Sequence, residues 1–141
     1  MDLDTTRGKY AYDKILDDFS RQNIQVLVGT QMVTKGLDFG KVALVGVLNA
    51  DQLLNYPDFR AFERSFQLLT QVSGRSGRRG TRGKVIIQSF TPYHNVIRQV
   101  MEHDFLAFYN DEILIRKNFH YPPFYRLIHL TLKHKNNHVL D

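Results

Sequence analysis

Three short, largely apolar runs, separated by segments with helical spacing, constrain the fold of this chain more than any other feature. The runs are Gln25–Val28, Val42–Leu48 and Val85–Phe90, and we interpret each of them as a strand. Strands that read as continuous apolar runs are typical of parallel sheets buried on both faces. Strands that alternate with helices indicate an α/β fold. The sequence therefore predicts an α/β fold in which helices cover both faces of a parallel sheet.

Apolar residues at spacings of three and four predict the helices of the chain. Helices are predicted over Lys9–Arg21, over His94–Glu102 and after Asp104. A loop is predicted over Ala50–Asp58, and a further strand over Arg126–Lys133. The helix after Asp104 must end before Pro122, because proline cannot continue a helix. We assign residues 1–103 to one domain, and residues 104–141 to a helix and the first strand of a second.

The composition excludes several classes of protein. The 141 residues include no cysteine, which leaves neither a disulfide framework nor a thiolate metal site. No apolar run approaches the roughly 20 residues of a membrane span, and no signal peptide opens the chain, so we expect a cytoplasmic protein without a membrane partner. His129 lies in the alternating strand, and His134 and His138 lie in a polar tail, so no metal site is predicted.

Positive charge is concentrated in the segment Gln71–Lys84, which reads QVSGRSGRRGTRGK and is called the Arg/Gly segment below. The net charge of +5 favours a polyanionic partner. Arginine suits bidentate contacts to phosphate oxygens, and glycine allows a backbone to turn or to approach a ligand closely. Taken alone, the segment is equally compatible with a solvated basic loop that follows a helix.

The helix before the Arg/Gly segment is predicted to have two contrasting faces. Its core face consists of Phe59, Phe62, Phe66 and Leu69. Successive helical residues are rotated by about 100°, and at this spacing a set of arginine and glutamine side chains falls within a stripe about 80° wide on the helix surface. This stripe consists of Arg60, Arg64, Gln67, Gln71, Arg75 and Arg78. Because Glu63 lies off the stripe, we interpret the stripe as directed towards an anionic ligand.

Polar residues follow two of the predicted strands. Thr30 comes after the first strand, and Asn49–Asp51 come after the second. Ligands of parallel sheets bind beyond the carboxyl ends of the strands, so these are candidate binding positions. In the next loop, Tyr56 is a better candidate for stacking on a nucleobase than the phenylalanines of the following helix, whose spacing favours core packing.

Two segments resemble motifs of the superfamily 2 helicases. GTQMVTKGLDF at Gly29–Phe39 resembles their motif V, and QVSGRSGR at Gln71–Arg78 resembles their motif VI. The sequence between these motifs is similar to bacterial replication-restart helicases in particular. The segments DTTR at Asp4–Arg7 and YPPF at Tyr121–Phe124 share this similarity. The resemblance covers nearly the whole chain.

The resemblance implies the second RecA-like lobe of an ATP-driven, 3′-to-5′ DNA translocase that acts in primosome assembly. It also implies that this lobe is incomplete at its N-terminus and is followed by a truncated C-terminal domain. ATP and Mg²⁺ would bind jointly with a first lobe, whose phosphate-binding loop and acidic motif have no counterpart here, so the fragment alone is expected not to hydrolyse ATP. Zinc is expected in the full-length protein and not in this chain. The expected partners are DNA, the first lobe and other primosome proteins, and the expected location is the bacterial cytoplasm at the nucleoid.

Five residues match the family positions that act on the nucleotide. Arg75 and Arg78 match the catalytic arginines that reach the γ-phosphate across the cleft between the lobes. Gln71 matches a glutamine near the phosphates, and Gly36 and Asp38 match the part of motif V that touches the nucleotide and couples it to DNA. These roles are implied by the resemblance.

Three further residues match positions that contact nucleic acid. Thr30 and Lys35 match the motif V positions that hold a DNA phosphate, and Arg7 lies in a region that resembles motif IV. Arg79 and Arg82 are interpreted as general charges that contact DNA or another domain. The alternatives are the second lobe of another superfamily 2 DNA translocase and a non-catalytic, basic nucleic-acid-binding module.

Overall fold

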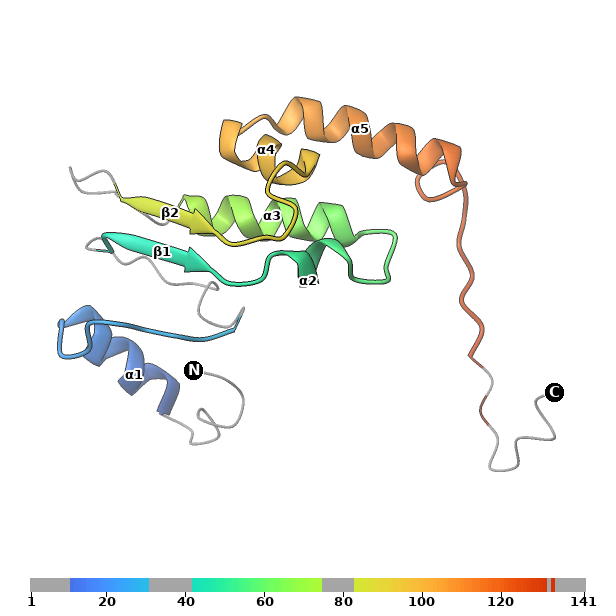
Figure 1. The fold of residues 1–141 in the computed structure, drawn as a ribbon. Helices are drawn as coiled ribbons and strands as arrows, with labels where there is room; N and C mark the ends of the chain where they lie inside the picture. Colours follow the sequence, from blue (N-terminus) through green and yellow to red (C-terminus); the bar gives the residue numbers. More distant parts are fainter. Residues whose placement is uncertain (1–10, 31–41, 75–82, 132, 134–141) are drawn as a thin grey trace. The chain divides into compact units, whose positions relative to one another are not determined.

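The computed structural model describes residues 11–30, 42–74, 83–131 and 133 (Figure 1). The chain forms two compact units, Met1–Asp104 and Phe105–Asp141. Whether the second unit begins a further domain stays a prediction. Among the predicted site residues, Thr30 and Gln71 lie within the described ranges.

Two strands of the first unit pair in parallel. β1 spans Leu44–Val47 and β2 spans Lys84–Ile87, with Leu44 opposite Lys84 and Val47 opposite Ile87 (Figure 1). The ladder continues past the strands, where the Ala50 backbone N–H donates to the carbonyl of Gln88 at 2.9 Å. Two of the predicted strands and their parallel arrangement are therefore confirmed, with shorter bounds than expected.

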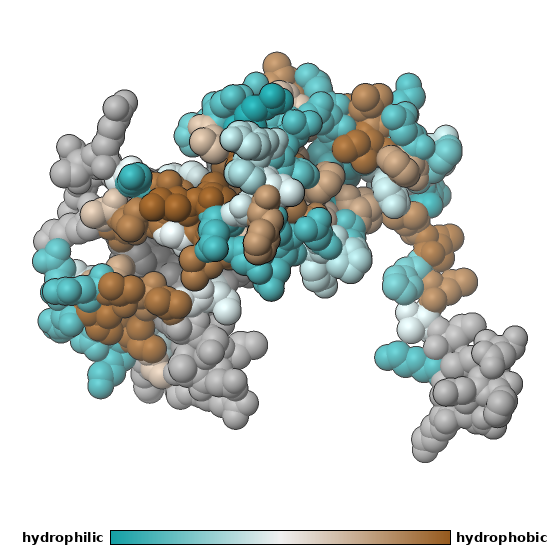
Figure 2. All heavy atoms as spheres, in the orientation of Figure 1, coloured by the Kyte–Doolittle hydropathy of each residue, from teal (hydrophilic) through white to brown (hydrophobic). Residues whose placement is uncertain are grey.

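The prediction of strands buried on both faces is wrong for this pair. In each strand, exposed and half-buried side chains alternate. Leu44 and Ile86 are 56% and 48% exposed, and Figure 2 shows an apolar surface over β1 and β2. In the described part of the chain, the sheet therefore consists of two strands with one half-buried face and one apolar, exposed face.

The predicted strand over Gln25–Val28 is also wrong. This segment has no regular secondary structure, and Val26 and Val28 are 73% and 67% exposed. A strand needs a partner for its backbone hydrogen bonds, and the sheet of the described residues contains only β1 and β2. The helix predicted before this segment is present as α1, which spans Ala11–Ser20.

Two helices lie between the strands. The predicted loop over Ala50–Asp58 instead contains a single helical turn, α2, at Asp51–Leu54, and α3 then spans Ala61–Ser73. α2 begins with an acidic residue, Asp51, which favours a helix amino end through the peptide dipoles. Strand, helix and parallel strand in this order form the βαβ unit that the sequence predicts.

The core of the first unit lies between α2, α3 and α4, which spans Asn95–Glu102 and agrees with the predicted helix. Its buried apolar side chains are Ala50, Leu54, Ala61, Phe66, Leu69, Val72, Val96, Ile97 and Val100. Phe66 and Leu69 confirm the predicted core face of α3, whereas Phe59 and Phe62 are half-buried. The Phe62 ring lies 5.2 Å from the ring of His94, whose Nδ1 accepts the Val96 N–H at the start of α4.

The second unit consists of α5, which spans Phe105–Asn118, and the chain after it. Arg116 pairs with buried Glu112 at 3.5 Å and donates to the Pro122 carbonyl at 3.1 Å. The helix ends before Pro122, as predicted. The predicted strand over Arg126–Lys133 is wrong, because residues 126–131 are irregular and Leu127, Ile128 and Leu130 are 53–84% exposed.

Candidate functional site

The structure describes two of the predicted site residues. Thr30 is exposed in a bend, and Gln71 is exposed in the last turn of α3. The helix ends at Ser73 with Gly74 as its C-cap. The other predicted site residues lie outside the described residues; they are Arg7, Lys35, Gly36, Asp38, Arg75 and Arg78.

The first half of the arginine stripe on α3 pairs with carboxylates of the same segment. Arg60 donates two hydrogen bonds of 3.1 Å to Glu63, and this contact raises the pKa of Arg60. Arg64 lies 2.7 Å from Asp58. The interpretation that this half of the stripe is directed towards an anionic ligand is therefore wrong. These pairs organise the start of α3 instead, because the Asp58 carboxylate also accepts the Arg60 backbone N–H at 2.9 Å.

A hydrogen-bond network joins the carboxyl ends of the two strands. Asp51 follows β1, and its carboxylate accepts from the Ser89 hydroxyl at 2.9 Å, the Phe90 backbone N–H at 3.0 Å and the Thr91 hydroxyl at 3.1 Å. The Ser89 hydroxyl also accepts the Thr91 backbone N–H at 3.0 Å. One carboxylate thus connects the loops after β1 and β2, at the edge of the sheet where ligands of α/β proteins bind.

These hydrogen bonds lower the pKa of Asp51 from its ordinary value of 3.8. The Phe90 N–H has the largest effect, and the hydroxyls of Ser89 and Thr91 add to it, while partial burial opposes them. A lowered folded-state pKa means that the ionised carboxylate stabilises the fold at neutral pH. This stabilisation is lost as the pH falls below 3.8 and through the folded-state pKa.

We predict that Asp51→Asn lowers the free energy of unfolding at pH 7 and that the difference from wild type shrinks on acidification. An amide places a donor where the carboxylate has an acceptor, so at least one of the three hydrogen bonds is lost at neutral pH. Urea unfolding of both proteins between pH 2 and pH 7 measures the difference, because the loss is expected below pH 3.8. A difference that stays constant over this range would contradict the role of ionised Asp51.

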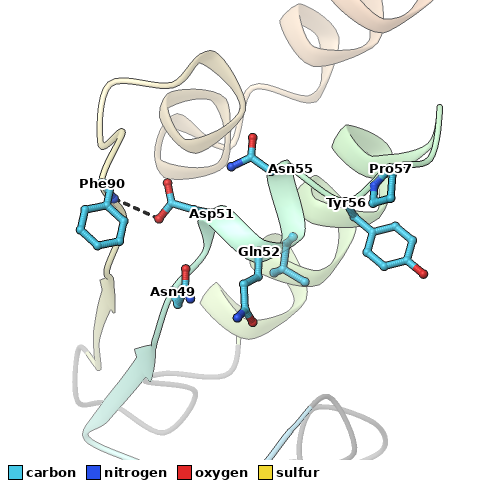
Figure 3. A pocket seen from close by; sticks show the side chains of 8 residues that line it. Asn49, Asp51, Gln52, Asn55, Tyr56, Pro57 and Phe90 are labelled. Atoms are coloured by element: carbon cyan, nitrogen blue, oxygen red, sulfur yellow. Dashed lines mark hydrogen bonds between the residues drawn. The ribbon is translucent and has the colours of Figure 1, made fainter.

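An open pocket of about 680 Å³ lies beside this network (Figure 3). Its lining residues are Asn49, Asp51, Gln52, Leu53, Asn55, Tyr56, Pro57 and Phe90. Figure 3 shows Phe90 at one end of the pocket, on the segment after β2, and Tyr56 with Pro57 at the other end, after α2. The pocket therefore contains apolar rings at its ends and polar side chains between them.

Sequence reasoning found half of this arrangement. Asn49–Asp51 stands out as a polar segment after a strand, and Tyr56 as a stacking candidate, but Ser89 and Thr91 carry no comparable signal. They become partners of Asp51 only because β1 and β2 pair in register. Ser89 lies inside the predicted strand Val85–Phe90, so no local pattern in the sequence marks it as a partner of Asp51.

Neither a metal cluster nor a membrane span is seen in the described parts of the chain. Across residues 11–30, 42–74, 83–131 and 133, no group of three or more His, Asp or Glu side chains could hold a metal ion. Over the same residues, no helix combines the length and the apolar character needed to cross a membrane.

Comparison with known proteins identifies relatives along the whole chain. The replication restart protein PriA of Bacillus subtilis is 50% identical over 135 residues, which are 96% of this chain. The protein of the same name from Synechocystis is 52% identical over all 141 residues, and that of Thermotoga maritima is 39% identical over 127 residues. The chain spans 17% of the length of each of these relatives.

A family model covers the part of the chain that contains both helicase-like motifs. Residues 3–80 match the helicase conserved C-terminal domain. The matched range includes β1, α2 and α3 and ends within the Arg/Gly segment. The match covers more than half of the 141 residues, so the chain belongs to the family of helicase conserved C-terminal domains.

Proposed function

We propose that this chain is the second motor lobe of an ATP-dependent, 3′-to-5′ DNA helicase that acts in bacterial replication restart. The observation that carries this proposal is the identity of 50% and 52% to two replication restart proteins over 96% and 100% of the chain. The helicase family match over residues 3–80 supports the same function. The parallel βαβ unit is consistent with a RecA-like lobe.

In this proposal, Arg75 and Arg78 neutralise the charge that develops on the γ-phosphate of ATP during hydrolysis. Guanidinium groups aimed at a transferring phosphoryl group stabilise its transition state. Gln71, exposed in the last turn of α3, would lie near the phosphates, and Gly36 and Asp38 would contact the nucleotide. Mg²⁺ supplies further charge neutralisation when bound, and we expect its carboxylate ligands on the first lobe.

Thr30, Lys35 and Arg7 are the residues that we propose to hold the DNA backbone. A hydroxyl and two cations suit phosphate oxygens, and such contacts make affinity depend steeply on salt. The proposed partners are single-stranded or forked DNA, the first lobe of the same helicase and other primosome proteins. The proposed location is the cytoplasm at the nucleoid, and zinc would bind elsewhere in the full-length protein.

ATP hydrolysis by this chain with and without a first lobe tests the proposal. The chain would be joined to the phosphate-binding lobe of the Bacillus subtilis relative, and hydrolysis would be measured with and without single-stranded DNA. We expect no hydrolysis by either part alone and DNA-stimulated hydrolysis by the joined protein. Forked substrates with only a 3′ or only a 5′ tail then test the direction, and we expect unwinding from the 3′ tail.

A non-catalytic nucleic-acid-binding module gives a different result in the same experiment. The chain would bind DNA with a steep salt dependence, but joining the first lobe would confer no ATP hydrolysis. That outcome would overturn the motor function while leaving the association with DNA intact.

A further inference from the structure

The pocket after β1 and β2 contains two aromatic side chains that are exposed to solvent. Phe90 is 91% exposed and Tyr56 is 60% exposed. They lie at opposite ends of the pocket and come from segments that are far apart in the sequence (Figure 3). An aromatic ring gains free energy when a flat, apolar surface covers it, so each ring is a platform for a planar ligand.

The charge of the pocket selects against phosphate as the group that enters it. Asp51 is the only charged residue among the eight described residues that line the pocket, and it is negative. Its carboxylate already accepts from Ser89, Phe90 and Thr91. Among these eight described residues no cation offsets the repulsion between Asp51 and a phosphate, whereas a neutral planar group would not be repelled.

The polar lining matches the edges of nucleobases. The exposed side chains of Asn49, Gln52 and Asn55 present both donors and acceptors along the pocket. Amide side chains can form paired hydrogen bonds with base edges, and the Watson–Crick edges are free for such contacts only in single strands. Aromatic platforms combined with amides are therefore a surface for unstacked bases rather than for a duplex.

We propose that this pocket binds unpaired bases of single-stranded DNA, with Phe90 and Tyr56 as stacking platforms and the phosphates outside it. The proposal rests on the proposed function, because it supplies a base contact to a DNA motor. Asp51 is a positioning residue in this site. Its carboxylate holds the Phe90 backbone N–H at 3.0 Å and thereby fixes the segment from which the Phe90 ring projects.

A tryptophan reporter tests the stacking directly. The chain contains no tryptophan, so Phe90→Trp introduces a single indole at the pocket. Tyr93→Trp is the matched control, because Tyr93 is 93% exposed, lies three positions away and does not line the pocket. Oligothymidylate is added to the complete helicase carrying either variant, and the tryptophan fluorescence is compared with that of the helicase without the added tryptophan. We expect strong quenching of the fluorescence from position 90 and little quenching from position 93.

Alanine variants measure the contribution of the platform to affinity. Phe90→Ala should weaken binding of oligothymidylate by about fivefold to a hundredfold, the effect of one aromatic–base stack, and Tyr93→Ala should not. An oligonucleotide of abasic sites should bind Phe90→Ala and wild type equally. Both exposed side chains can be truncated without opening the core.

The outcomes separate this proposal from the motor function. If the helicase hydrolyses ATP and unwinds DNA while Phe90→Ala binds oligothymidylate like wild type, the base site is wrong and the motor function stands. If position 90 is quenched but the joined protein hydrolyses no ATP, the base site stands and the motor is wrong. Loss of ATP hydrolysis in Phe90→Ala at unchanged DNA affinity would overturn the proposal, because Phe90 would then act on hydrolysis and not on base binding.

Discussion

Arg78→Ala in the complete helicase is expected to lower the rate of ATP hydrolysis at saturating DNA by at least about 10³-fold, and Arg75→Ala should have a similar effect. An arginine that neutralises a transferring phosphoryl group contributes about 10³- to 10⁵-fold to the rate. DNA affinity should change little in both variants, because the charge acts on the nucleotide. Steady-state hydrolysis with single-stranded DNA and fluorescence anisotropy measure the two quantities.

Arg64→Ala is the matched control for these variants. Arg64 belongs to the same predicted stripe, but its guanidinium lies 2.7 Å from Asp58 at the start of α3. Its removal should leave hydrolysis within a few-fold of wild type. DNA-stimulated hydrolysis at a near-normal rate in either Arg75→Ala or Arg78→Ala would refute the catalytic role of that arginine.

Leu69→Ala is expected to lower the free energy of unfolding by about 3 kcal/mol, within the usual range of 2–5 kcal/mol for a large buried side chain. Leu69 is 1% exposed and lies on the face of α3 that packs in the core between α2 and α4. Removing its side chain loses apolar burial and leaves a cavity. Urea unfolding monitored by circular dichroism measures the change.

Gln67→Ala provides the comparison on the same helix. Gln67 is exposed, and its side-chain amide donates a hydrogen bond to Glu63 at 3.3 Å. Surface substitutions of this kind change stability by about 0.5 kcal/mol or less. A loss of under about 1 kcal/mol in Leu69→Ala would mean that the α3 interface contributes little to the stability of the first unit.

Local patterns in the sequence predict the helices well. The spacing of Phe66 and Leu69 predicts the buried face of α3, and α1 and α4 form close to the expected bounds. Helical hydrogen bonds connect residues four positions apart, so the information that forms a helix lies within it. The resemblance to the helicase motifs likewise depends on short stretches of sequence, and it agrees with the match to the helicase family.

Features that depend on distant partners are less predictable. Gln25–Val28 and Arg126–Lys133 are apolar enough to be predicted as strands, but residues 25–28 and 126–131 are irregular, and the sheet of the described residues offers them no paired strand. Helical spacing also places Arg60 on a stripe of arginine and glutamine residues, although Glu63, which lies off the stripe, accepts a hydrogen bond from the Arg60 guanidinium. Asp51 and Ser89, 38 positions apart, meet only through the strand pairing.

The parallel pairing of β1 and β2 also constrains the order in which this unit can fold. Leu44 and its ladder partner Lys84 are separated by the whole of α2 and α3, so the ladder cannot close by local zipping. A preformed α3 shortens the span of flexible chain that must be closed and so reduces the entropy lost on closure. The helix should therefore consolidate before the sheet, and slower refolding of Leu69→Ala in stopped-flow experiments would reveal that sequence of events.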